Sequence, residues 1–142
     1  MSNSNIQLLH HVCLPVKDLA AAKRFYIEGL GLTQHNQIAS WIMINDFSAI
    51  HLVGTPAPAP QEGSSRPVRH FALRVYDLAS VAVRLLDAKM QVFQMDSSLN
   101  RQEVKSTQDT LSFGTGTLFV EDPSGNLIEF IEVGRGLFSQ YS

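Results

Sequence analysis

The sequence lacks several features that would place it in a special class. It has 142 residues and one cysteine, Cys13, so an intrachain disulfide framework is excluded. No apolar run approaches the roughly 20 residues that span a bilayer, and the N-terminal MSNSNIQ has no charged or apolar region typical of a secretion signal. The net charge is -2, without a basic cluster for nucleic acid. We therefore expect a cytoplasmic globular protein with neither nucleic-acid nor membrane partners.

The chain contains two copies of one pattern. Residues 11–19, HVCLPVKDL, match residues 70–78, HFALRVYDL, and each copy begins with His and ends in Asp-Leu. The alternating apolar residues predict a strand, and those after Asp-Leu recur at helical spacing. Asp18 and Asp77 are good residues to cap these helices. The match pairs His11 with His70 and leaves His10, expected at the surface, in the place of Arg69.

Each copy then ends in a strand, a turn and a strand. Residues 41–54 turn around Asn-Asp, and residues 116–133 turn around DPSGN. Aligning the two turns places His51 of the first copy on Glu129 of the second. Each copy is thus predicted to fold as β-α-β-β-β. The predicted class is α+β, with two modules pairing into an open curved barrel that has one shared cleft.

Composition predicts the boundaries within one domain, residues 1–142. A segment rich in Pro, Gly and Ser separates the modules. A polar, aperiodic stretch at 96–113 predicts a long loop of the kind that often covers a site. The predicted parts are a first module at 6–54, a linker at 55–67, a second module at 68–133 and a tail at 134–142.

Strand alternation places four polar side chains on one side of the predicted sheets. Successive strand residues point to opposite faces, so the residues between the core-facing apolar ones point away from the helices. Three imidazoles and one carboxylate in a cleft suit a divalent ion such as Zn, Ni, Co, Mn or Fe. Such a set leaves positions open for water or substrate. The four predicted metal ligands are His11, His51, His70 and Glu129.

Three segments resemble the vicinal oxygen chelate superfamily, which includes glyoxalase I, extradiol dioxygenases and bleomycin-resistance proteins. They are LHHVCLPVKDLAAAKRFYIEGLGL, RHFALRVYDL and FVEDPSGNLIEFIE, and the resemblance spans residues 8–133. It implies paired modules around one metal, in proteins that often dimerise and in some cases share the cleft between chains. It assigns ligand positions to His11, His70 and Glu129, with Glu129 as candidate catalytic base. The fourth position, His51, is usually Glu in bacterial glyoxalase I, and His51 can either bind the metal or support another ligand.

Four further residues are expected to line the cleft and contact substrate. Arg74 can hold a carboxylate or phosphate, or it can pair with an acidic residue. Cys13 is most simply a small buried apolar residue near His11. Trp41 and Phe119 can line an apolar pocket or belong to the core.

Three functions are compatible with this pattern. The first is a metal-dependent lyase or isomerase of the glyoxalase type, in which a small carbonyl compound or thiol adduct chelates the metal. The second is an Fe(II) extradiol dioxygenase that uses His11, His70 and Glu129. The third is a metal-free small-molecule binding protein of the bleomycin-resistance type, which the four polar residues disfavour. We expect one divalent metal ion, a small-molecule substrate and a homodimer.

Overall fold

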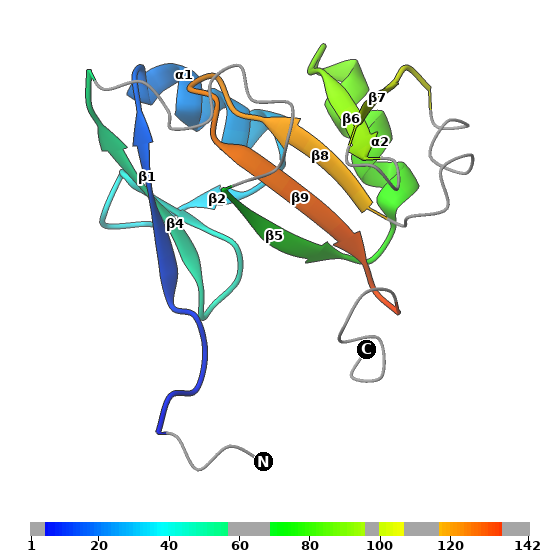
Figure 1. The fold of residues 1–142 in the computed structure, drawn as a ribbon. Helices are drawn as coiled ribbons and strands as arrows, with labels where there is room; N and C mark the ends of the chain where they lie inside the picture. Colours follow the sequence, from blue (N-terminus) through cyan, green and yellow to red (C-terminus); the bar gives the residue numbers. More distant parts are fainter. Residues whose placement is uncertain (1–4, 57–68, 96–99, 107–116, 135–142) are drawn as a thin grey trace.

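The computed structural model describes residues 5–56, 69–95, 100–106 and 117–134 (Figure 1). Most of the predicted linker and tail, and parts of the predicted loop, lie outside these residues. No helix in the described part of the chain is long and apolar enough to cross a membrane. The elements are, in order, β1 (His11–Val16), α1 (Leu19–Lys23), η1 (Arg24–Gly29), β2 (Thr33–Gln34), β3 (Trp41–Met43), β4 (Ala49–Gly54), β5 (His70–Val75), α2 (Leu78–Asp87), β6 (Val92–Met95), β7 (Arg101–Val104), β8 (Thr117–Glu121) and β9 (Leu127–Glu132).

The strands form two sheets with matching topology. The first has the order β1-β4-β3-β2 and the second the order β5-β9-β8-β6-β7. In each, the first strand runs parallel to the last strand of its own module. The predicted α+β fold of two modules is confirmed, and the two sheets do not close on each other (Figure 1).

The second sheet has one strand more than the sequence predicts. The polarity of residues 96–113 predicts a loop, whereas β7 lies within this stretch and pairs antiparallel with β6. Val104 is buried in the main core, while Glu103 of the same strand is exposed. A strand of four residues is too short for its alternation to stand out. Its pairing with β6, a tertiary contact, gives it its structure.

The predicted alternation in β1 and β5 is confirmed. Val12, Leu14 and Val16 contact the main core, together with their counterparts in β5. His11 and Cys13, which alternate with these residues in β1, are exposed. Asp18 accepts a hydrogen bond from the backbone of α1, and Asp77 caps α2 in the same way, as predicted. The helices therefore cover one face of each sheet, and the face that bears His11 and His70 remains open.

The buried core of the DPSGN turn is a hydrogen-bonded cluster around Asp122. Its Oδ1 accepts hydrogen bonds from the backbone N–H groups of Ser124 and Asn126, at 2.8 and 2.9 Å. Its Oδ2 accepts one from the Asn126 side chain at 2.9 Å. Gly125 has φ +84°, a conformation that glycine adopts without steric cost. The structure of the turn therefore accounts for Asp122, Gly125 and Asn126 in its sequence.

The same cluster joins the two modules. The Tyr26 hydroxyl in η1 donates to Asp122 Oδ2 at 2.8 Å. The Asn126 side chain donates to the Pro15 carbonyl at 2.9 Å, and the backbone N–H of Lys17 donates to Ser124 Oγ at 2.8 Å. Both Tyr26 and Asp122 are buried. Burial, reinforced by the Asp122 carboxylate, raises the pKa of Tyr26 well above its usual 10.0, so its hydroxyl remains a donor.

We predict that Tyr26→Phe lowers the free energy of unfolding by about 1–3 kcal/mol, because Asp122 loses a buried hydrogen bond. Because the folded state favours the protonated Tyr26 hydroxyl, its contribution to stability is complete below about pH 10. This contribution is lost as the pH rises towards the pKa of Tyr26 in the folded state. The difference in free energy of unfolding between wild type and variant, measured by urea unfolding, should therefore become smaller above pH 10. Tyr76→Phe is the matched control, since Tyr76 is 93% exposed and should change nothing. A difference that stays constant above pH 10 would contradict the role of this hydroxyl.

Candidate metal and substrate site

The first module presents His11 and His51 on its open sheet face. His51 in β4 lies opposite Cys13 in β1, so His11, two residues earlier in β1, points to the same side. The ring centroids of His11 and His51 are 6.3 Å apart. His11 is exposed and His51 is half-buried. Both imidazoles are thus available to a ligand that approaches this face.

The second module presents His70 and Glu129 in the same manner. Glu129 in β9 lies opposite Ala72 in β5, two residues after His70. His70 Nε2 and Glu129 Oε2 are 3.0 Å apart, and their side chains are 29% and 16% exposed. The register of this pair repeats that of His11 and His51. His51 and Glu129 are therefore structural equivalents, as the aligned turns predict.

An aromatic residue stands beside each pair at equivalent positions. Trp41 lies opposite His51 on the neighbouring strand β3, and Phe119 lies opposite Glu129 on β8. The Trp41 ring is 4.8 Å from that of His11 and 5.2 Å from that of His51. The Phe119 ring is 5.8 Å from that of His70. Both predicted aromatic contacts thus lie next to the predicted ligands.

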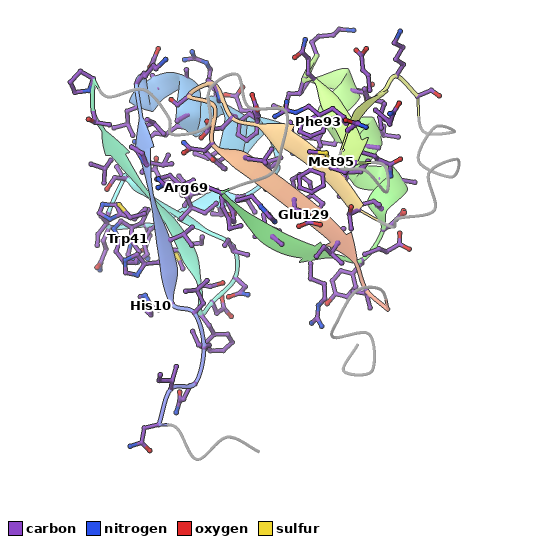
Figure 2. All side chains as sticks on the ribbon, in the orientation of Figure 1. His10, Trp41, Arg69, Phe93, Met95 and Glu129 are labelled. Atoms are coloured by element: carbon purple, nitrogen blue, oxygen red, sulfur yellow. The ribbon has the colours of Figure 1, made fainter. Side chains whose placement is uncertain are left out.

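The structure does not bring all four predicted ligands together. Trp41, which lies beside the first pair, and Glu129 of the second pair belong to different sheets, and Figure 2 shows them apart. Among the described residues of one chain, no group of three His, Cys, Asp or Glu side chains is placed to hold a metal ion. A cavity of about 710 Å³ between the modules is lined by His11 and His70, but His51 and Glu129 are not among its lining residues. One chain therefore offers two separate pairs of donors.

The chemistry of these donors fits a divalent metal. Imidazole nitrogens and a carboxylate oxygen are ligands that Zn and other first-row ions accept. A catalytic site uses three protein ligands or more, whereas each pair supplies two. A metal would need both pairs at once, and this requirement bears on the assembly of the protein.

The remaining predicted substrate contacts differ in their surroundings. Arg74 is exposed and lines the cavity together with His70. Cys13 is exposed on the open face opposite His51, so the expectation of a buried residue is wrong. Cys13 lies on the side of β1 opposite Val12 and Leu14, which face the core, so its thiol is exposed to solvent.

His10 is exposed, as expected, but its ring lies next to that of His11. Alternation within a strand would place it on the face opposite His11, whereas its Nδ1 is 3.0 Å from His11 Nδ1. Its ring also contacts Trp41, with 5.9 Å between centroids. Since β1 begins at His11, His10 lies outside the strand and is not bound by the strand's alternation.

A second apolar cluster was missed at the sequence level. Phe93, Met95, Phe119 and Leu127 pack together, separate from the main core. The guanidinium of Arg101 lies 4.1 Å from the centre of the Phe93 ring. The available signal is the segment QVFQM, in which Phe93 and Met95 alternate with residues that face the core.

Comparisons with known proteins agree with the fold. Three solved structures, each with under 25% identity, share the fold. A fosfomycin resistance protein from Listeria monocytogenes has 16% identity and a TM-score of 0.62, covering 95% of this chain and 98% of that one. An antibiotic-binding protein from a Streptomyces species has 21% identity and a TM-score of 0.60, covering 92% and 98%. A lactoylglutathione lyase from Agrobacterium tumefaciens has 17% identity and a TM-score of 0.56, covering 91% and 96%.

Sequence comparison gives the family. No curated protein matches the chain. The sequence model of the glyoxalase/bleomycin resistance protein/dioxygenase superfamily matches residues 8–130, which include most of both modules and all four predicted ligands. The chain therefore belongs to this superfamily, the vicinal oxygen chelate proteins that its repeated motifs resemble.

Proposed function

We propose that this protein is a metal-dependent, glyoxalase-like lyase or isomerase whose metal site is completed by two chains. One chain would supply His11 and His51, and the other would supply His70 and Glu129. The observation that carries the proposal is the equivalent register of the two pairs. Each pair lies on an open sheet face, beside an aromatic ring, and offers half of a ligand set.

A symmetric homodimer would join the halves. In a two-fold dimer the same surfaces meet twice, so the first pair of each chain can meet the second pair of the other. Two equivalent sites would result. The open face of the first sheet supports such a contact, because Val53 is 39% exposed there and Trp41 is only partly buried. These apolar groups would be removed from water in such a dimer, which would favour association.

A divalent ion held by these residues would act as a Lewis acid on two adjacent oxygens of a small carbonyl compound or thiol adduct. Glu129 would move the proton in the isomerisation, because its carboxylate is partly exposed beside His70 on the open face. Arg74, exposed on the same side of β5 as His70, would bind an anionic substituent of the substrate. Cys13, Trp41 and Phe119 would form the walls around the reacting end.

An iron-dependent extradiol dioxygenase is the second candidate. His11, His70 and Glu129 are the two imidazoles and one carboxylate that such iron sites use. His51 favours this alternative over strict glyoxalase I, because a histidine stands where bacterial glyoxalase I usually has Glu. Iron in the purified protein with oxygen uptake on catechols would select it. A protein that takes up no divalent ion would instead be a small-molecule binding protein.

We predict that Co²⁺ or Ni²⁺ quenches the fluorescence of Trp41, because these paramagnetic ions would bind beside its ring. Trp41 is the only tryptophan, so the signal reports on the first pair alone. His11→Ala should weaken the metal affinity by at least about 10–100-fold, the cost of losing a residue that merely supports a ligand. His35→Ala is the matched control and should keep the affinity, because the His35 ring bonds the backbone of Gln37 and Ile38 in its own turn. Equal affinities of all three proteins would argue against His11 as a ligand.

We further predict that two inactive variants restore each other when mixed. His11→Ala/His51→Ala and His70→Ala/Glu129→Ala should each lose tight metal binding and activity. After subunit exchange at equal concentrations, half of the dimers are mixed and carry one intact site, so about a quarter of wild-type metal content should return. The returned metal is measured as metal bound per chain after gel filtration. Native mass spectrometry monitors the subunit exchange. Exchange without any return of metal would mean that the site is not shared.

A further inference from the structure

The first module contains a contact between the rings of two neighbouring histidines. His10 Nδ1 and His11 Nδ1 are 3.0 Å apart, which is the distance of a hydrogen bond. His10 lies where the N-terminal segment enters β1 (Figure 2). Within a strand, the side chain before His11 would point to the opposite face. The contact therefore depends on the start of β1 at His11.

Two further contacts hold His10 in this place. Its carbonyl accepts a hydrogen bond from the backbone N–H of Ala49, at 3.1 Å. Its ring meets the ring of Trp41 edge to face, with centroids 5.9 Å apart and planes at 73°. Edge-to-face contact is a preferred arrangement of aromatic rings. The backbone and the ring of His10 are thus anchored independently of His11.

A hydrogen bond at Nδ1 decides how His11 can bind a metal. In a neutral imidazole one ring nitrogen donates a hydrogen bond and the other accepts. When Nδ1 of His11 donates to His10, the lone pair of Nε2 is left for a metal. Within the described part of the chain, His11 Nε2 makes no hydrogen bond. Histidine ligands almost always have a partner at their second nitrogen, which fixes the orientation of the ring.

The second module has no counterpart of His10. Arg69 occupies this place before His70. A guanidinium carries only donors, so it cannot accept a proton from a histidine nitrogen. His70 Nε2 instead lies 3.0 Å from Glu129 Oε2. The contact between neighbouring histidines therefore belongs to the first module.

We propose that His10 is a positioning residue of the metal site, which accepts a hydrogen bond from His11 Nδ1 and so directs His11 Nε2 towards the metal. His10 itself touches neither the metal nor the substrate. The role needs an acceptor atom at the δ position of residue 10, and it does not need the ring as such. The inference rests on the proposed function, because His11 is a metal ligand only there.

Two substitutions separate the hydrogen bond from the packing of the ring. His10→Asn keeps an acceptor, Oδ1, at the δ position, whereas His10→Phe keeps a ring against Trp41 and has no acceptor. We expect His10→Phe to weaken the Co²⁺ affinity of the full-length protein about 10-fold in calorimetry. This is the lower end of the range for such partners, because water can partly replace an exposed hydrogen bond. His10→Asn should keep most of the affinity.

The tautomer of His11 gives a readout that needs no metal. Nitrogen-15 NMR at about pH 8.5, where imidazole is neutral, distinguishes protonated from unprotonated ring nitrogens. In metal-free wild type and His10→Asn, His11 should carry its proton on Nδ1. In His10→Phe the proton should be shared between both nitrogens of His11. The spectrum of His11→Ala identifies the signals, and thermal unfolding verifies that each variant is folded.

Three results would overturn the proposal. The first is an unchanged tautomer of His11 in His10→Phe, and the second is Co²⁺ binding by His10→Phe with the affinity of wild type. The third is an equal loss of affinity in His10→Asn and His10→Phe, because His10 would then act through its ring or as a ligand itself. If the tautomers are as expected but the protein takes up no divalent ion, the proposed function fails and not the hydrogen bond that orients His11.

Discussion

The buried cluster around Asp122 is the constraint on which the rest of the structure depends. The DPSGN turn connects β8 to β9, so it determines where β9, the strand that carries Glu129, begins. The Asp122 carboxylate accepts a hydrogen bond from the Tyr26 hydroxyl of the first module. The Asn126 side chain donates one to the carbonyl of Pro15 in β1. One group thus fixes both the strand that carries a candidate ligand and the placement of the other module. A buried charge of this kind is tolerated because every bond to it is made within the turn and its partner helix.

From this placement the surface chemistry follows. The helices pack against one face of each sheet. The opposite faces carry the four predicted ligands in equivalent positions, namely His11, His51, His70 and Glu129. Duplication of one module explains why two half-sites exist, each incomplete in itself. In the proposed dimer, a second chain would complete each half-site without any change in the fold.

The sequence predicted what depends on local periodicity. The face of His11 and the equivalence of His51 with Glu129 follow from two-residue alternation and from the repeat. The sequence could not predict features that depend on tertiary contacts. The strand β7 exists through pairing with β6, and Arg101 reaches Phe93 only because of that pairing. The orientation of His10 depends on where β1 begins. The placement of the two modules also involves contacts such as that of Tyr26 with Asp122, two residues 96 positions apart, which local periodicity does not reveal.

The most direct measurement of the central claim is an anomalous difference map from crystals of the protein loaded with Co²⁺ or Zn²⁺. The account predicts one peak per chain, surrounded by His11 and His51 of one protomer and by His70 and Glu129 of its partner. A peak bound by residues of a single protomer would contradict the shared site. Crystals soaked in either ion without a peak at these residues would contradict the metal site itself.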